Sequence, residues 1–141
     1  MTMPQSVFDM SGRRVLITGG GTGLGQRFAH TLAAAGATVI LAARRADRLE
    51  QTARALHERG ASAHCVTMDV ASAASVANAF RAIAEIGPLD VLVNNAGTAA
   101  DQSLLDIGED EWDRVMDANL KGAWLVARAA ATAMIAAGTG G

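Results

Sequence analysis

A glycine-rich loop that directly follows a short apolar run constrains this chain more than any other feature. The apolar run covers residues 15–17, and the loop covers residues 18–25, of which five are glycine. Glycine lets a backbone turn tightly, and a helix that starts there directs free N–H groups and the positive end of its dipole at an anion. We therefore predict a site for a nucleotide pyrophosphate. Its residues are Thr18, Gly19, Gly21, Thr22, Gly23, Leu24 and Gly25.

Two other interpretations of the loop have to be weighed. Glycine-rich turns between a strand and a helix also occur where only tight packing requires them. The loop has no Gly-Lys-Ser/Thr ending, which disfavours a P-loop NTPase, and the gap between Gly19 and Gly23 is wider than in the Gly-x-Gly-x-x-Gly motif. A preceding strand and a following helix form the context that favours nucleotide binding.

The composition is that of one soluble domain. The chain has 141 residues, half of them hydrophobic, and a net charge of −2, so nothing in its charge points to a nucleic-acid partner. Its longest apolar or small stretch, residues 32–43, is shorter than the roughly 20 residues of a membrane span. No basic segment followed by an apolar one opens the chain. We predict a cytoplasmic protein without a membrane partner.

Cysteine and histidine give no sign of redox or metal chemistry. Cys65 is the single cysteine, and its apolar neighbours predict a buried thiol. His30, His57 and His64 lack the spacing of metal ligands, so we expect surface or packing roles for them and no metal site.

Apolar runs alternate with helical patterns along the chain. The runs cover residues 15–18, 38–42, 63–68 and 91–94, and the helical patterns cover residues 25–35, 47–59, 72–86 and 109–137. Gly36 and Gly60 follow helices, Ser72 is placed to cap the third helix, and Gly87-Pro88 ends it. The sequence therefore predicts an α/β fold, a Rossmann-like doubly wound parallel sheet that is incomplete, with the first four strands and their helices. Residues 1–141 form one partial dinucleotide-binding domain.

Two arginines end the second predicted strand, where dinucleotide folds contact the adenosine ribose. An acidic residue at this place accepts from the 2′-hydroxyl of NAD, whereas Arg44 or Arg45 would bind the 2′-phosphate of NADP. We predict NADP as the cofactor, with NAD as the alternative. The arginines would otherwise be solvated charges at the start of a helix that also carries Asp47 and Glu50.

Three further segments, together with the loop, carry a family resemblance. Asp69-Val70 ends the third strand, Asn94-Asn95-Ala96-Gly97 ends the fourth, and Asn119 lies within residues 112–122. In order and spacing these segments closely resemble the short-chain dehydrogenase/reductases, from about Phe8 to the last residue. The resemblance implies hydride transfer between a nicotinamide and a small-molecule carbonyl compound or secondary alcohol.

The resemblance also implies a role for each matched position. Asp69 would contact the adenine amino group with Val70 beside the ring, and Asn95, Ala96 and Gly97 would line the cofactor, with Asn95 steadying the Thr18 region. Asn119 is the one member of the family's catalytic Asn-Ser-Tyr-Lys set in this chain, where it would bend a helix and hold a water of a proton relay. The alternatives are a helix cap for Asp69, a strand-end turn for Asn94 and Asn95, and a satisfied core amide for Asn119.

The last predicted helix has an apolar stripe and a face of small residues. Helical periodicity places Asn119 near Trp112, Val115 and Met116 on an inward-facing stripe. We interpret the apolar side chains of this helix as packing residues rather than a cofactor site; they are Trp112, Met116, Leu120, Trp124 and Met134. In the family the small-residue face joins subunits; here it consists of Ala123, Ala127, Ala130 and Ala131.

The chain departs from the family at the catalytic residues. It has no tyrosine, its only lysine is Lys121, and no serine follows Ser103, so the family's Ser and Tyr-x-x-x-Lys are missing. We expect a truncated sequence whose 141 residues have no measurable reductase activity, because the proton-transfer group is absent. A catalytically silent NADP-binding module is the alternative, and a methyltransferase-like adenosine binder is a third. An open apolar edge at residues 91–93 predicts chain pairing, with a dimer or tetramer at full length.

Overall fold

The computed structural model describes residues 7–140, and the predicted domain range of 1–141 therefore includes residues 1–6 and 141 that lie outside it. Four strands alternate with helices in chain order, as predicted. The elements are β1 (Arg14–Thr18), α1 (Gly23–Ala34), β2 (Thr38–Ala43), α2 (Ala46–His57), β3 (Ala63–Thr67), α3 (Ala73–Ile86), β4 (Val91–Val93), α4 (Glu109–Met116), the π-helical turn η1 (Asp117–Lys121) and α5 (Gly122–Ala137).

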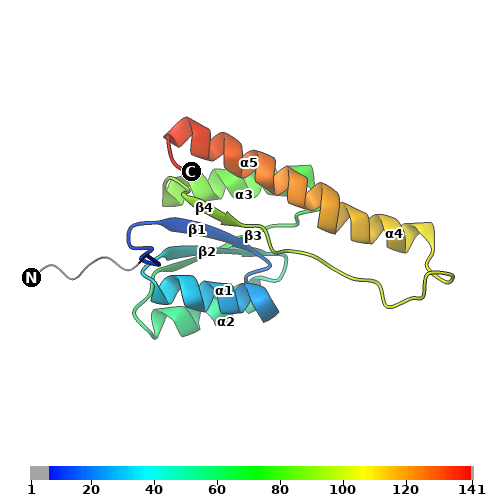
Figure 1. Cartoon of the computed structure of the whole chain (residues 1–141), viewed down its shortest axis with the longest axis horizontal. Helices are drawn as coiled ribbons and strands as arrows, with labels where there is room; N and C mark the ends of the chain where they lie inside the picture. The colour runs from blue at the N-terminus through cyan, green and yellow to red at the C-terminus, as the bar shows by residue number, and fades with distance from the viewer. Residues whose placement is uncertain (1–6, 141) are drawn as a thin grey trace, which may run out of the picture.

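All strand pairs are parallel, and the order across the sheet is β3-β2-β1-β4. Helices α1 and α2 cover one face of the sheet, while α3 and α5 cover the other (Figure 1). The predicted α/β fold with a doubly wound Rossmann-type sheet is therefore confirmed. Strand β1 lies between β2 and β4, so the glycine loop that follows it has a strand on each side.

Burial on both faces explains why β1 and β2 are continuous apolar runs. Val15 and Ile17 point into a core beneath α1 and α2, whereas Leu16 points into a second core beneath α3 and α5. All three side chains are fully buried. Successive side chains of a strand point to opposite faces of the sheet. Because helices cover both faces here, consecutive positions in the middle of a central parallel strand are apolar.

The predicted element ends agree with the structure to within about two residues, and their signals work as expected. Ser72 caps α3, because its Oγ accepts a hydrogen bond from the Ser75 N–H at 3.2 Å. Gly36 and Gly60 follow α1 and α2 with φ angles of 97° and 77°, a region that favours glycine.

Two predictions about burial are wrong. Cys65 is exposed, because β3 is an edge strand of the sheet. The stripe of the last helix is only partly buried: Trp112, Leu120 and Trp124 are 54%, 63% and 55% exposed, and Asn119 is exposed as well. Helix α4 contains no buried residue and extends beyond the sheet (Figure 1), so no strand lies beneath this end of the stripe.

The small-residue face of the last helix is divided between two environments. Ala130 is buried in the core with Val126, so it is not free to join another subunit. Ala127 and Ala131 are exposed, and Ala123 is half-buried. Within residues 7–140, the continuous run Glu109–Ala137 is the only helix long and apolar enough to cross a membrane, a test that core helices of soluble proteins also pass.

Candidate dinucleotide site

The loop between β1 and α1 packs so closely that most of its glycines have little or no room for a side chain. A Cβ atom on Gly25 would lie 2.1 Å from the Gly19 carbonyl oxygen, and one on Gly21 would lie 3.0 Å from the Arg48 Cβ. Gly19 has a φ of 69°, and its N–H donates to the Ala42 carbonyl at 2.8 Å. Tight packing thus explains Gly25 and Gly21, whereas a Cβ on Gly23 would meet open space.

Helix α1 begins with amide N–H groups that no hydrogen bond within residues 7–140 is seen to occupy. Its first intrahelical hydrogen bond runs from the Gln26 N–H to the Thr22 carbonyl, so the N–H groups of Gly23, Leu24 and Gly25 precede the helical ladder. The Thr22 side chain makes no capping bond, and the first turn carries no acidic residue. The helix start is therefore able to bind an anion through its backbone.

Thr18 and Asn95 join β1 to the segment that follows β4. The buried Thr18 Oγ1 accepts hydrogen bonds from the N–H groups of Asn95 and Ala96, both at 2.9 Å, while the Asn95 Nδ2 donates to the Thr18 carbonyl at 2.9 Å. These contacts are the ones expected for an Asn95 that steadies the central strand. They fix the backbone of Ala96 and Gly97 above the carboxyl end of β1.

A cavity of about 380 Å³ opens at the carboxyl ends of the strands. Nine of the predicted residues line it: Gly19, Gly21, Thr22, Arg44, Arg45, Asp69, Val70, Ala96 and Gly97. Five others are not among the lining residues: Thr18, Gly23, Leu24, Gly25 and Asn95. Asn119 is also outside the lining, although Asp117 and Ala118 of the same π-helical turn belong to it. The cavity volume falls in the range of small-molecule sites.

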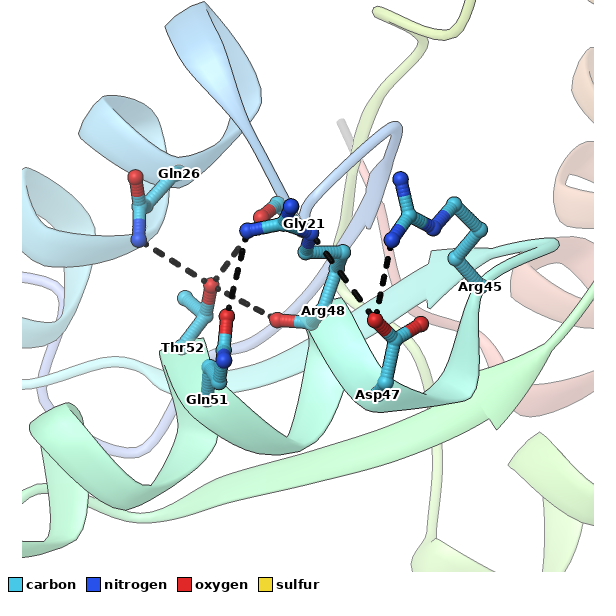
Figure 2. Close-up of polar contacts among 7 residues, drawn as sticks. All are labelled: Gly21, Gln26, Arg45, Asp47, Arg48, Gln51 and Thr52. Atoms are coloured by element: carbon cyan, nitrogen blue, oxygen red, sulfur yellow. Dashed lines mark hydrogen bonds and ion pairs between the residues drawn. The ribbon is translucent and has the colours of Figure 1, made fainter.

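One side of this cavity is basic. Arg44, Arg45 and Arg48 line it together, at the end of β2 and the start of α2. Arg45 Nη2 lies 3.0 Å from Asp47 Oδ2, and Arg48 Nε lies 3.8 Å from the same oxygen (Figure 2). The hydrogen bond from Arg45 is the main cause that lowers the pKa of Asp47 below its usual 3.8.

Asp69 keeps one carboxylate oxygen available. Its Oδ1 accepts from the Ala71 N–H at 3.0 Å, and its own N–H donates to the Ser75 Oγ at 2.9 Å. Among residues 7–140 no hydrogen bond reaches its Oδ2, so this oxygen is free to accept from a ligand amine. The cap of α3 is Ser72, as predicted, and the Asp69 carboxylate only forms the turn before it.

The Asn119 side chain binds the segment after β4 through a pair of hydrogen bonds to one backbone residue. Its Oδ1 accepts from the Thr98 N–H and its Nδ2 donates to the Thr98 carbonyl, both at 2.8 Å. Arg114 binds the same segment, donating to Thr98 Oγ1 at 2.8 Å and to the Ala99 carbonyl at 2.9 Å. The core-amide alternative for Asn119 is therefore wrong in its burial, since this amide is satisfied while exposed.

Asn119 reaches Thr98 from a π-helical turn, whereas Arg114 reaches it from α4. The turn occupies Asp117–Lys121, between α4 and α5, and such turns widen a helix locally and frequently occur at functional sites. Glu111 orients Arg114 through bonds of 2.6 and 2.7 Å. The hydrogen bond from Arg114 is the main cause that lowers the pKa of Glu111 below its usual 4.5.

Sequence reasoning missed several residues of this site. Arg48, Thr98, Arg114, Asp117 and Ala118 all line the cavity. Arg48 lies in the first turn of α2, four residues after Arg44, so a third basic residue close behind the arginine pair is visible in the sequence. No comparable signal marks Arg114, because its contact with Thr98 depends on where the long helix packs. Across residues 7–140, no three acidic, histidine or cysteine side chains gather as a metal site would require.

Comparison with known proteins identifies the family. A family model described as short chain dehydrogenase matches residues 13–141. The chain belongs to the short-chain dehydrogenase family. Membership in this family leaves no support for the methyltransferase-like alternative.

Relatives in this family have dehydrogenase names. Gluconate 5-dehydrogenase of Gluconobacter oxydans is 34% identical over 95% of this chain and 53% of its own length. The 2-dehydro-3-deoxy-D-gluconate 5-dehydrogenase of Escherichia coli is 38% identical over 96% of this chain and 53% of its own length. This short-chain dehydrogenase sequence spans about half the length of such curated relatives.

Solved structures of the family superpose closely. A short-chain dehydrogenase/reductase from Mycobacterium marinum has a TM-score of 0.91 and 40% identity, covering 96% of this chain and 55% of its own. A gluconate 5-dehydrogenase from Burkholderia cenocepacia, solved with NADP and tartrate, has a TM-score of 0.88 and 40% identity over 94% of this chain and 52% of its own. Nicotinamide-dinucleotide binding is thus supported for this fold.

Proposed function

We propose that this chain is the cofactor-binding part of an oxidoreductase that transfers hydride between NADP(H) and a small carbonyl compound or secondary alcohol. One observation carries the proposal. A single cavity joins the glycine loop that leads into α1, through Gly19, Gly21 and Thr22, to three arginines and to the Asp69-Val70 turn.

The chemistry of the cavity fits each part of a phosphorylated dinucleotide. The amides at the start of α1 would hold the pyrophosphate, Arg44 and Arg45 would hold the 2′-phosphate, and the free Asp69 oxygen would accept from the adenine amine. Val70 would lie beside the adenine ring, and Ala96 and Gly97 present backbone without bulky side chains along the same cavity. The bound cofactor would supply the hydride.

Asn119 would serve the complete enzyme through the backbone it fixes. Its two hydrogen bonds set the position of Thr98, next to Gly97 at the cavity wall. A Cβ on Gly97 would come within 3.2 Å of the Asn119 Oδ1, so the amide also limits side-chain size at the wall. We assign to Asn119 the catalytic position that the family motif implies, with a water of the proton relay held at this turn.

Nucleotide titration of the 141-residue chain by calorimetry tests the cofactor proposal. We expect NADP to bind more tightly than NAD, and Arg44→Asp to weaken NADP by about tenfold or more while NAD changes little, because a charge-assisted contact becomes a repulsion. Arg54→Ala, an exposed arginine of α2 that is not among the cavity residues, is the matched control. Equal binding of both cofactors by the wild type and by Arg44→Asp would remove the arginines from cofactor selection.

The 141 residues on their own are proposed to bind without turning over substrate. They contain no tyrosine, and their only lysine is Lys121, whose Nζ lies 3.4 Å from Asp117 Oδ1. Without a group that transfers the proton, the acid–base contribution of about 10²–10⁴-fold is lost. Consumption of NADPH by the purified chain with a panel of ketones would contradict this proposal.

The silent-module alternative rests on the same absence of tyrosine and makes a different prediction for a longer chain. If the coding sequence continues into a Ser and a Tyr-x-x-x-Lys, joining that segment to these 141 residues restores turnover; if it does not, NADP binds with no reaction. We also propose a cytoplasmic location and a dimer or tetramer. The β4 edge and the exposed Trp112 and Trp124 support association, which light scattering on the longest available chain would measure.

A further inference from the structure

The arginines of the cavity are not equivalent, and the difference lies in one carboxylate. Asp47 Oδ2 accepts a hydrogen bond from Arg45 at 3.0 Å and is 3.8 Å from Arg48 Nε. Arg48 Nη1 donates in addition to Gln51 Oε1 at 3.4 Å. No ion pair within residues 7–140 involves Arg44. One acidic oxygen therefore serves two of the three cations.

Figure 2 shows how this carboxylate is placed. Asp47 stands between the side chains of Arg45 and Arg48, and Arg48 extends toward Gly21 of the glycine loop. Both arginines line the cavity, but Asp47 does not. An anionic group of a ligand that reaches Arg45 and Arg48 would have to share them with Asp47, whose negative charge would lie next to it.

We propose that Asp47 determines how strongly this site selects a phosphorylated cofactor, by competing with the 2′-phosphate for Arg45 and Arg48. The inference rests on the proposed NADP function and adds, to the basic residues that favour phosphate binding, an acidic residue that weakens it. A fixed carboxylate beside a bound phosphate costs binding energy through like-charge repulsion, and it occupies donors that the phosphate needs. Arg44, which makes no ion pair with Asp47, would then bind the 2′-phosphate without this competition.

A structural role for Asp47 has to be separated from this one. Asp47 lies in the first turn of α2, where a carboxylate stabilises the positive end of the helix dipole. A residue with only that role would change the thermal stability of the chain when replaced. It would not distinguish two nucleotides that differ by one phosphate.

The experiment uses a pair of probes that differ only at the 2′ position. Adenosine 2′,5′-bisphosphate carries the phosphate and 5′-AMP lacks it, and both are titrated calorimetrically into wild type, Asp47→Asn and Asp47→Ser. Asn and Ser retain a polar group near the helix start, and circular dichroism checks folding. Glu50→Gln is the control, since it removes one exposed negative charge from α2 at a residue outside the cavity.

We expect Asp47→Asn to raise the affinity for the bisphosphate by about threefold to fivefold, the size of one screened surface-charge interaction. The affinity for 5′-AMP should not change. In an Arg45→Ala background the gain should shrink, because the competition for that arginine is gone. A weaker or unchanged bisphosphate affinity, an equal gain for both probes, or the same gain in Glu50→Gln would overturn the inference. Failure of wild type to bind either probe would overturn the proposed function itself.

Discussion

The glycine loop after β1 and the segment of residues 96–99 after β4 face the same cavity, yet they are held there by different means. The loop is fixed by close backbone contacts, such as that of Gly25 with the Gly19 carbonyl. The segment is fixed at one end by Thr18 and at the other by side chains of a largely exposed helix, Asn119 and Arg114.

The difference predicts two kinds of sensitivity to mutation. Where an added Cβ would lie far inside the van der Waals distance of a backbone atom there is no room for a side chain, so changes in the loop should act through steric overlap. Hydrogen bonds from exposed side chains contribute about 1 kcal/mol each and are lost one at a time. A single substitution in the loop should therefore cause a large loss of stability and cofactor affinity, whereas single substitutions at the contacts of the segment should each cause a small loss.

The strongest test of this comparison is Gly25→Ala. The added methyl group would lie 2.1 Å from the Gly19 carbonyl oxygen, so the loop has to move. We expect a loss of about 1–3 kcal/mol in unfolding free energy and at least a tenfold loss of NADP affinity, measured by urea denaturation and calorimetry.

Gly108→Ala is the matched control for this substitution. A Cβ at Gly108 meets nothing within 4 Å, and the residue has an ordinary φ of −84°. It should change NADP affinity by less than about twofold, since it touches no part of the cavity. Wild-type affinity in Gly25→Ala would show that the loop is not held by close packing.

Asn119→Ala sharpens the comparison from the other side. It removes two hydrogen bonds of 2.8 Å to Thr98 and should cost about 1–2 kcal/mol of stability and roughly fivefold in NADP affinity. Leu120→Ala, at a neighbouring side chain that is 63% exposed, should change neither. If the two variants behave alike in thermal unfolding and titration, Asn119 does not hold the segment.

The smallest effect concerns the Glu111 and Arg114 pair. Arg114 lowers the pKa of Glu111 in the folded chain below the ordinary value of 4.5. The pair therefore contributes its full stabilisation at pH values above 4.5, and this contribution is lost as the pH falls through the lower pKa of the folded state. NMR titration of the Glu111 carboxyl group should give a midpoint below 4.5 in wild type and a return toward 4.5 in Arg114→Ala. An unchanged midpoint would remove Arg114 as the cause.

Much of the fold follows from local patterns. The alternation of apolar runs with helical patterns predicted a parallel sheet, and the runs at residues 15–18 and 38–42 form two of its strands, which pair with each other. Ser72 capped its helix as its position indicated. The prediction that Cys65 is buried was wrong, because a short apolar run does not reveal whether its strand lies at the centre or at the edge of the sheet.

The candidate site divides in the same way. Nine lining residues come from motifs that are short in sequence, such as the glycine loop and Asp69-Val70. Arg114 and Thr98 are 16 residues apart in the sequence, and their contact depends on where α4 lies relative to the segment after β4. Periodicity assumes a regular helix with one covered face, so it placed Asn119 inward when the amide is exposed.

The sequence by itself determined that this chain builds alternating strands and helices around a glycine loop with two arginines one strand later. These signals are local, because turn chemistry and strand burial depend on neighbouring residues. Only the tertiary structure decided which cations share Asp47 and which side chains hold Thr98. Those contacts depend on how α2 and the long helix pack, and packing joins residues that no local pattern connects.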